Sequence, residues 1–289
     1  MKILVFIVVI ILLILCECIR ELRRFKITHY TVTSAKLSEL SKEKKVILLS
    51  DLHNHCYGKN NADLIQAIQN QQPDIILIAG DMLVGKKGES VEIAASLIER
   101  LPNICPVCYG NGNHEQRMKE HPEKYGDTYV KYKKRLQASG VIFLENNSRI
   151  RMMDETVLEI YGLELPMTCY EKFKKEKLMQ KTMVKCLGTS NANLYQILIA
   201  HNPIYFEAYR TWGADLVVSG HLHGGVARIP GWRGVITPQG FLFPPYSGEK
   251  TTKEQSTIVV SKGLGTHTVN LRVCNPAEVV VIHLQSEEK

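Results

Sequence analysis

The chain opens with an unbroken apolar run from Ile3 to Cys16, and only Glu17 interrupts its continuation to Ile19. A run of this length reaches the lower limit of a membrane span, which predicts a membrane-anchor helix within residues 1–26. A cleavable signal peptide is the alternative, but the run ends without the small residues that a cleavage site requires. A buried core helix is disfavoured because no polar positions mark an exposed face.

Residues 27–44 are polar and are expected to form a linker, after which short apolar runs are separated by amphipathic segments. The runs at 46–50, 75–79, 107–110, 141–144, 197–200, 216–219, 257–261 and 279–284 predict strands. Helical spacing predicts helices over 61–70, 90–100 and 128–138. Because α and β segments alternate early and β segments dominate later, we expect residues 45–289 to form one α/β (α+β) domain with layered sheets.

The composition is that of a globular protein. With 45% hydrophobic and 22% charged residues in a length of 289, the sequence lies near the average of folded soluble proteins. The formal net charge of +7 fits an anionic membrane, nucleic acid or a phosphorylated substrate equally well. Aromatic residues make up only 7% and are not interleaved with basic ones, so we expect no nucleic-acid partner.

Basic residues and cysteines both bear on the side of the membrane that the domain occupies. Arg20, Arg23, Arg24 and Lys26 follow the apolar run closely, and positive charge there retains a segment in the cytoplasm. The eight cysteines show no disulfide-framework spacing, and the single C-x-x-C lacks the further ligands of a zinc site. Unpaired thiols fit a reducing compartment. We therefore expect a membrane-anchored protein whose domain faces the cytoplasm.

Side chains that bind metals or act on phosphate follow five of the predicted strands. They are Asp51 with His53, Asp81, Asn113 with His114, His201, and His221 with His223. Loops beyond the carboxyl ends of strands form the usual ligand crevice of layered α/β folds, so we expect these groups to converge. Alternation along an extended segment places Asp51 and His53 on one side, and His221 and His223 likewise.

The motifs D-x-H, G-D, G-N-H-E, a strand-end His and G-H-x-H, in this order, resemble the calcineurin-like metallophosphoesterase family from about Lys45 to the C-terminus. The resemblance narrows to a membrane-anchored bacterial branch of the YkuE/YaeI type. The residues that carry it are Gly220 to Gly225, Ile229-Pro230-Gly231, Thr237-Pro238 and Gly263 to Gly265.

The resemblance implies a four-layer α-β-β-α sandwich with a binuclear metal centre. One ion would be held by Asp51, His53, Asp81 and His223, and the other by Asp81, Asn113, His201 and His221. Nitrogen and oxygen ligands together suit Mn, Fe or Zn better than Mg or Ca. His114 is the predicted catalytic residue: it would stand beside the ions as a cation that stabilises charge on the phosphoryl group or protonates the leaving oxygen.

Several further positions are interpreted less directly. The family often has a carboxylate or amide where this chain has Val84, three residues after Asp81. Because that residue lies behind the ligands, we expect its replacement to alter the properties of the bound metal rather than to abolish metal binding. His55 is interpreted as a surface histidine, with substrate contact as the alternative. We expect Glu115 to orient its neighbours, and a place for His267 at the border of the pocket is left open.

Substrate selection is weakly encoded. Arg117, Arg228 and Arg233 are interpreted as solvated or structural, with a second phosphate contact as the alternative. The lysine-rich segment 171–185 is interpreted as a solvated helix face, with an amphipathic lid on anionic lipid as the alternative.

The combined reading is a two-metal phosphoesterase that hydrolyses a phosphodiester, pyrophosphate or phosphomonoester bond by attack of a metal-activated water. An anchored enzyme has ready access to lipid substrates, and the likeness extends to UDP-diacylglucosamine pyrophosphatases. The alternative is a non-catalytic, metal-stabilised membrane scaffold for a protein partner. Retention of the complete ligand set argues against that alternative.

Overall fold

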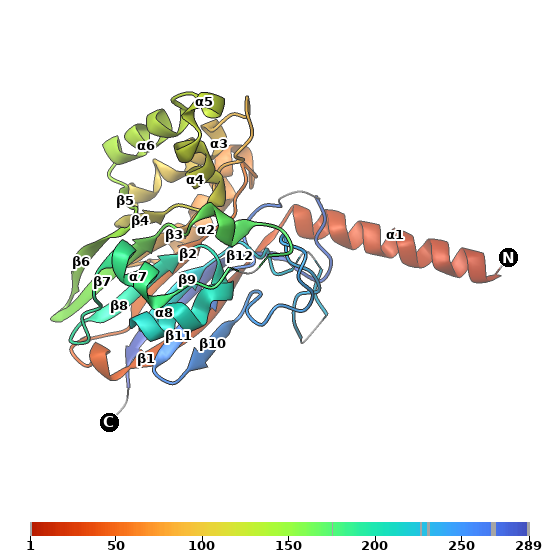
Figure 1. The fold of residues 1–289 in the computed structure, drawn as a ribbon. Coiled ribbons are helices and arrows are strands. Elements are labelled where there is room, and N and C mark those ends of the chain that lie inside the picture. Colours follow the sequence, from red (N-terminus) through yellow and green to blue (C-terminus); the bar gives the residue numbers. More distant parts are fainter. Residues whose placement is uncertain (1, 175, 226, 230–231, 267–269, 288–289) are drawn as a thin grey trace.

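The computed structural model describes residues 2–174, 176–225, 227–229, 232–266 and 270–287. Helix α1 (Lys2–Leu22) projects away from the rest of the chain (Figure 1). Six positions of the expected membrane anchor, at 3, 4, 10, 11, 13 and 14, have side chains that lie outside the description. In the part of the chain that is described, no helix is long and apolar enough to cross a membrane.

Two six-stranded sheets form the centre of the molecule. The first has the order β1 (Phe25–Ser34), β12 (Ala277–Ser286), β2 (Lys44–Leu49), β3 (Ile75–Ala79), β4 (Val107–Gly110) and β5 (Ile142–Leu144). The second has the order β10 (Lys250–Lys253), β11 (Ser256–Val260), β9 (Leu216–Ser219), β8 (Tyr195–Ala200), β7 (Thr156–Leu163) and β6 (Asn147–Met153). Within each sheet the central strands run parallel, β2 to β4 in the first and β7 to β9 in the second.

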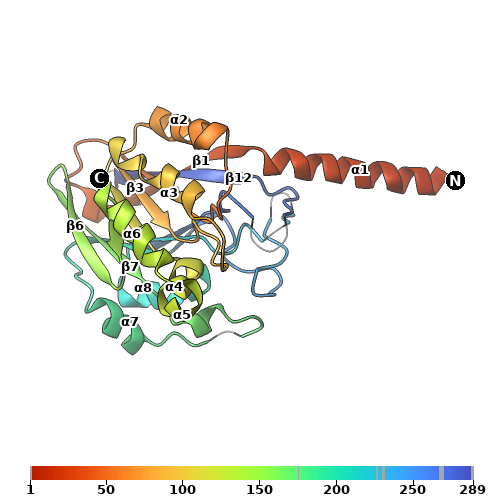
Figure 2. The ribbon, with the colours of Figure 1, turned by 90° about the horizontal axis from the view of Figure 1, so that it is seen from above.

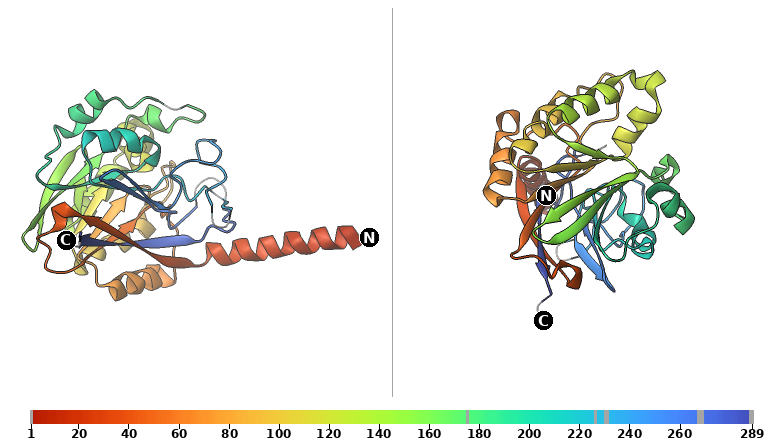
Figure 3. Two further views of the ribbon diagram at one scale, coloured as in Figure 1. Left: turned by 90° about the horizontal axis from the view of Figure 1, so that it is seen from below. Right: turned by 90° about the vertical axis from the view of Figure 1, so that its left-hand side faces the viewer.

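Helices cover the outer face of each sheet (Figures 2 and 3). The first sheet carries α2 (Ala62–Gln71), α3 (Glu92–Ile98), α4 (Asn113–Glu120), α5 (Pro122–Tyr125) and α6 (Thr128–Ala138), and the second carries α7 (Gln180–Leu187) and α8 (Phe206–Trp212). This arrangement confirms the expected α-β-β-α sandwich.

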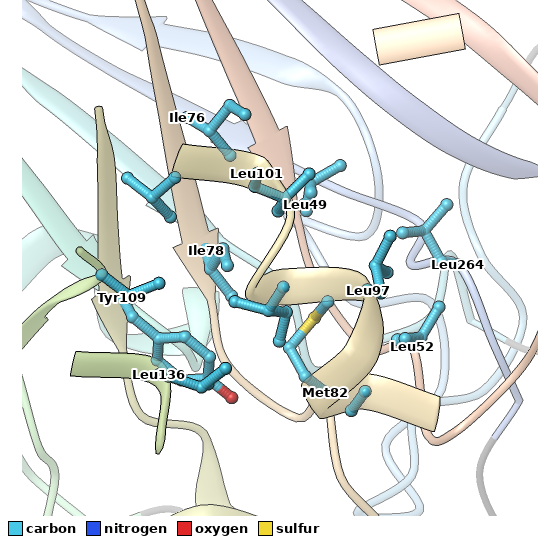
Figure 4. Close-up of a cluster of buried hydrophobic side chains, with 14 of the residues drawn as sticks. Leu49, Leu52, Ile76, Ile78, Met82, Leu97, Leu101, Tyr109, Leu136 and Leu264 are labelled. Atoms are coloured by element: carbon cyan, nitrogen blue, oxygen red, sulfur yellow. The ribbon is translucent and has the colours of Figure 1, made fainter. Parts of the chain in front are cut away.

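Alternation along the buried strands builds this layering. In β2, Val46 and Leu48 face the second sheet, whereas Ile47 and Leu49 face the helices. Both faces are apolar because both are covered, as expected for parallel strands between layers. Figure 4 shows the helix side, where Leu49 and Ile78 meet Leu97 and other apolar side chains.

The segment expected to be a linker is largely structured. Residues 25–34 form β1, which pairs in parallel with β12 from Phe25↔Ala277 to Ser34↔Ser286. This strand was not expected because it lacks the apolar run that marks the buried strands, although its alternation of polar and apolar positions is typical of a half-buried edge strand. The domain therefore begins at β1, directly after α1, and the expected linker is part of its first sheet.

Other elements also differ from the sequence pattern. Strands β6, β7 and β10 and helices α4, α5 and α8 were not expected. The lysine-rich segment 171–185 is helical only from Gln180, and Lys175 lies outside the described residues. The unexpected helices have at most eight residues and β10 has four, too few for a clear periodicity, whereas β7 has eight mostly buried residues whose apolar positions are those of a strand.

Candidate metal centre

The strand-end side chains converge on one point where the two sheets meet. Among the described residues, three groups have ligand atoms within 4.8 Å of one another. They are Asp51 with His53 and His223, Asp81 with His201 and His221, and His53 with Asp81 and His114. The first two groups divide the residues as the family resemblance implied.

Each of the two buried carboxylates lies close to an imidazole nitrogen. His201 Nε2 is 3.1 Å from Asp81 Oδ2, and His223 Nε2 is 3.4 Å from Asp51 Oδ1. Nε2 of His53 lies 4.0 Å from an oxygen of both carboxylates, which places its ring between them. The geometry thus supplies nitrogen and oxygen donors around two adjacent points.

Backbone carbonyls set the tautomer of three of these histidines. The Nδ1–H groups of His53, His201 and His223 donate to the carbonyls of Leu83, Ala79 and Gly265, at 3.2, 2.5 and 3.3 Å. The proton of a neutral ring is then on Nδ1, which leaves a lone pair on Nε2 facing the carboxylates. This orientation is typical of metal-ligating histidines.

Two observations show that cations fit this centre. The Nε2 atoms of His53 and His223 are 3.1 Å apart, and two facing lone pairs repel unless a cation or a proton lies between them. Asn113 Oδ1 is buried and has no hydrogen-bond partner in the described part of the chain, although buried acceptors are normally satisfied. Two divalent ions, one beside His53 and His223 and one beside Asn113, would satisfy both.

The carboxylates depend on positive charge. Burial raises the pKa of Asp51 from 3.8 to about 7, although His201 opposes that rise. Burial would also raise the pKa of Asp81, but nearby imidazoles, His201 foremost, outweigh it and hold that pKa well below its usual range. Burial lowers the pKa of His201, yet Asp81 outweighs this and raises it to about 9. Protons on imidazole thus balance the charge that metal ions would balance.

His114 differs from the other histidines in its hydrogen bonding. Its Nδ1 accepts a hydrogen bond from the Gly85 amide at 2.7 Å, so a neutral ring carries its proton on Nε2. That Nε2 lies 3.8 Å from Asp81 Oδ2, at the edge of the centre. A neutral His114 ring would therefore present a donor rather than a lone pair to the centre, which supports the predicted role beside the ions.

His221 is held by a residue that the sequence did not single out. Its Nε2 lies 3.3 Å from Gln239 Oε1, and the Gln239 amide donates to the carbonyls of Cys169 and Glu171, which fixes the amide orientation. In this orientation His221 would bind a metal through Nδ1. Gln239 directly follows the Thr237-Pro238 pair, the only signal that pointed toward this position.

Glu115 organises the loop that carries Asp81. Its carboxylate accepts hydrogen bonds from the backbone amides of Asp81, Met82, Leu83 and Gly112, and from the hydroxyl of Tyr109, at 2.8 to 3.1 Å. The side chain is fully buried, and burial raises the pKa of this carboxyl. This geometry confirms that Glu115 orients its neighbours.

The backbone is strained where ligand candidates lie. Left-handed φ angles of 46° to 69° occur at Asp51, His53, Asp81, His221 and His223. Non-glycine residues adopt this region rarely and at a cost of about 1 kcal/mol or more each, and such residues cluster at functional sites. The surrounding hydrogen bonds hold the strain in place.

Two motif glycines permit close approach to the carboxylates. A Cβ on Gly220 would lie 2.2 Å from Asp51 Oδ2, and one on Gly112 would lie 2.2 Å from Asp81 Oδ1. The absence of a side chain at Gly220 lets the His221 amide donate to both Asp51 oxygens, at 3.0 and 3.1 Å. The G-H and G-N-H motifs therefore position carboxylates as well as imidazoles.

The remaining candidates have other surroundings. His55 contacts the backbone of Leu22 at the end of α1, and burial lowers its pKa, so it is a structural residue. Arg228 donates to Glu249 and to the carbonyl of Trp232, which confirms a structural role. His267 and the Pro230-Gly231 pair lie outside the described residues.

Tyr170 borders the centre without any signal in the sequence. Its ring centroid lies 5.1 Å from that of His221 and 6.1 Å from that of His201. The ring lies on the second-sheet side of the ligands, in a 3-10 turn over Met167–Tyr170. Tyr170 therefore shields this side of the imidazoles from water.

Comparisons with known proteins agree with the geometry. Residues 44–225 match the family model described as calcineurin-like phosphoesterase. Metallophosphoesterase Cj0846 of Campylobacter jejuni is 27% identical over 260 residues, which cover 88% of this chain and 62% of that protein. Metallophosphoesterase YkuE of Bacillus subtilis is 25% identical, with 90% of this chain and 85% of that protein covered.

A further relative carries an activity in its name. Phosphodiesterase YaeI of Escherichia coli is 25% identical over 189 residues, which cover 64% of this chain and 63% of that protein. The chain thus spans less than two thirds of the length of both the Campylobacter and the Escherichia proteins.

Proposed function

Because the chain belongs to the calcineurin-like phosphoesterase family and is thereby a metal-dependent hydrolase of phosphoric esters, we propose that it cleaves a phosphodiester or diphosphate bond in a membrane lipid. The observation that carries the proposal is the convergence of two buried carboxylates with imidazole nitrogens whose lone pairs face them. The name of phosphodiesterase YaeI supports a diester over a monoester.

Seven side chains hold two divalent ions in this proposal. Asp51, His53 and His223 hold one, and Asn113, His201 and His221 hold the other, with Asp81 shared. The mixture of nitrogen and oxygen donors favours Mn, Fe or Zn. Such ions, when bound, polarise phosphoryl oxygens and lower the pKa of a water molecule so that it becomes a nucleophile.

His114 donates a hydrogen bond to the substrate in this proposal, in addition to the contacts that the ions would make. The Gly85 amide holds its Nδ1 as an acceptor, so Nε2–H is directed toward the centre. A positioned donor of this kind stabilises the charge that grows on a phosphoryl or leaving oxygen during displacement. Glu115 keeps the Asp81 loop and the start of α4, where His114 lies, in a fixed relation.

Helix α1 attaches the chain to a membrane in this proposal. Its described apolar side chains are exposed, Phe6 and Leu12 by 66% and 54%, and among its described side chains, Cys18 and Glu21 in the last turns are buried against the domain. Arg23 and Arg24 follow directly and favour a cytoplasmic position for the domain. Lipid phosphates at that surface would be the accessible substrates.

The test is hydrolysis by the full-length chain, purified in detergent and supplied with Mn²⁺. Generic phosphodiester, phosphomonoester and lipid-diphosphate substrates are compared, with a chelator as the control. The proposal expects turnover of a diester or diphosphate that the chelator abolishes and Mn²⁺ restores. Metal bound in stoichiometric amounts without turnover of any substrate would instead support the non-catalytic scaffold.

A further inference from the structure

An apolar lobe follows the metal-ligand motif of His221 and His223. The lobe comprises residues 227–229 and 232–243, and five of its apolar side chains are exposed by 39% to 63%. They are Ile229, Trp232, Ile236, Leu242 and Phe243. Phe173 joins them, because its amide donates to Gln239 and its ring covers Gly240 while remaining 76% exposed.

The exposed apolar side chains belong to an ordered arrangement. The rings of Trp232 and Phe243 lie with centroids 5.2 Å apart, and Ile236 pairs with Leu242 across an antiparallel bridge. The amide of Phe243 donates to the carbonyl of Val235 at 3.0 Å. Backbone pairing thus fixes the lobe while its apolar side chains point outward, so folding alone does not account for their presence.

The lobe is fixed to the end of α1. The Arg228 amide donates to the carbonyl of Val273 at 3.0 Å, and two residues later the Asn275 amide donates to the buried carboxylate of Glu21 at 2.9 and 3.1 Å. Figures 1 and 3 show that the loops after β9 lie at the end of the body from which α1 projects. A membrane that binds α1 would therefore lie next to the lobe.

Charge at this end of the molecule is positive. Arg23, Arg24, Lys26 and Arg233 are exposed there. The acidic neighbours are already engaged, Glu21 by Asn275 and Glu249 by Arg228. Apolar and aromatic side chains beside basic ones form the composition that binds at the interface of an anionic bilayer.

We propose that the lobe is a second membrane contact, which inserts Trp232, Leu242 and Phe243 into the headgroup region of an anionic bilayer beside α1. Gln239 of the same lobe holds His221, so this contact places the metal centre at the membrane surface. The inference rests on the proposed attachment by α1 and adds the site through which a lipid phosphate reaches the ions.

The test uses the two tryptophans of the full-length chain. Trp212 is buried, with 3% exposure, and Trp232 is exposed by 53%, so Trp232 alone is available to lipid. The chain is reconstituted into phosphatidylglycerol vesicles with or without brominated acyl chains. We expect a blue shift and a loss of Trp232 emission with brominated lipid, whereas the residual Trp212 emission of Trp232→Phe keeps its intensity.

Matched variants test whether the quenching requires the apolar side chains of the lobe or only exposed apolar side chains in general. Leu242→Ser with Phe243→Ser should reduce the quenching of Trp232. Ile150→Ser with Met152→Ser, on β6, removes side chains of similar exposure, 57% and 54%, and should leave quenching unchanged. Unaltered Trp212 emission reports that each variant is folded.

Three outcomes overturn the inference. If the chain sediments with vesicles but Trp232 is not quenched, α1 alone makes the attachment. If the chain does not sediment with vesicles, the proposed attachment fails as well, whereas hydrolysis of a soluble diester tests the reaction separately. A blue shift that grows with protein concentration without vesicles would assign the lobe to contact between copies of the chain.

Discussion

At the scale of single residues, the direction of one ring proton separates His114 from the ligands. His53, His201 and His223 donate through Nδ1 to carbonyls, whereas His114 accepts through Nδ1 from the Gly85 amide. A neutral ring whose proton lies on Nε2 presents a donor and not a lone pair at that nitrogen, which is the nitrogen that His114 directs toward the centre. Local backbone groups therefore assign different roles to side chains of the same type.

His114→Ala should abolish most turnover and keep the metals. The variant removes a donor that acts on the reacting phosphate, and a positioned group of this kind contributes roughly 10²- to 10⁴-fold to rate. Measurement of kcat together with elemental analysis checks both parts. His55→Ala is the control, because His55 contacts α1 and not the centre, and it should retain activity. A parallel loss of metal in His114→Ala would make this histidine a ligand.

Asp81→Ala should lower the metal content more than any other single change. Asp81 groups with His53, a proposed ligand of one ion, and with His201 and His221, proposed ligands of the other, so in the proposed centre its carboxylate would serve both ions. Elemental analysis of Mn-supplemented protein is expected to give roughly two equivalents for the unaltered chain, as for two-metal sites in general, and a sharp fall for the variant. Asp127→Ala, at an exposed position before α6, is the control. Full retention of both ions in Asp81→Ala would exclude the shared position.

At the scale of elements, one buried side chain joins the β3 loop to α4. Glu115 accepts from three consecutive amides of the loop and from Gly112 at the start of the helix. Glu115→Gln replaces one acceptor oxygen by a donor that would face backbone N–H groups. Unsatisfied buried groups cost about 1–3 kcal/mol each, so we expect a loss of this order in the free energy of unfolding.

Chemical denaturation with and without Mn²⁺ measures this loss. Glu120→Gln is the matched control on the same helix, since the Glu120 carboxylate is exposed and accepts only from Gln116 among the described residues. Equal stability of the two variants would show that the Glu115 hydrogen bonds do not hold the loop.

A second element-scale contact gives a pH dependence. Burial raises the pKa of Glu145, but hydrogen bonds from Lys133, Tyr129 and Lys119 outweigh it and lower the pKa from 4.5 to about 2. A carboxyl with a lowered pKa stabilises the fold above its unfolded pKa, and this stabilisation is lost as the pH falls from about 4.5 toward 2.

Glu145→Gln should therefore destabilise the protein at pH 7 by roughly 2 kcal/mol, a value that allows for partial solvent screening. The difference from the unaltered chain should shrink as the pH falls through this window, because protonation removes the same charge. Urea unfolding at pH 7, 4 and 3 checks the trend. A difference that stays constant with pH would exclude the ionised network as its source.

At the scale of the whole molecule, the sidedness of the domain is open to a direct test. Arg20, Arg23, Arg24 and Lys26 favour a cytoplasmic position of everything after α1. Protease added to intact spheroplasts of an expressing bacterium should leave the domain uncut, and the same protease should degrade it after lysis. Digestion before lysis would place the domain outside the membrane and shift the expected substrates to the cell envelope.

Sequence alone was sufficient for the central strands and the residues at their ends. Strands β3, β4 and β9 have the predicted bounds, because a buried parallel strand is a continuous run of mostly apolar residues that the following glycine or polar residue ends. Asp81 follows β3 after Gly80 and His201 follows β8 directly, so their meeting at one edge followed from strand direction. The edge strand β1 lacks such a run and shows only alternating polar and apolar positions, and its parallel pairing with β12, some 250 residues away, is a tertiary contact that the pattern does not contain.

Tertiary structure decided what each converging side chain does. The carbonyl that orients His201 comes from Ala79, 122 residues earlier, and the one that orients His223 comes from Gly265, 42 residues later. Gln239 and Gly85 contact their histidines across shorter separations, 18 and 29 residues, which still join different elements. Protonation and ligand geometry depend on contacts in space, and a linear pattern of residue types carries no record of which backbone group lies beside a given ring nitrogen.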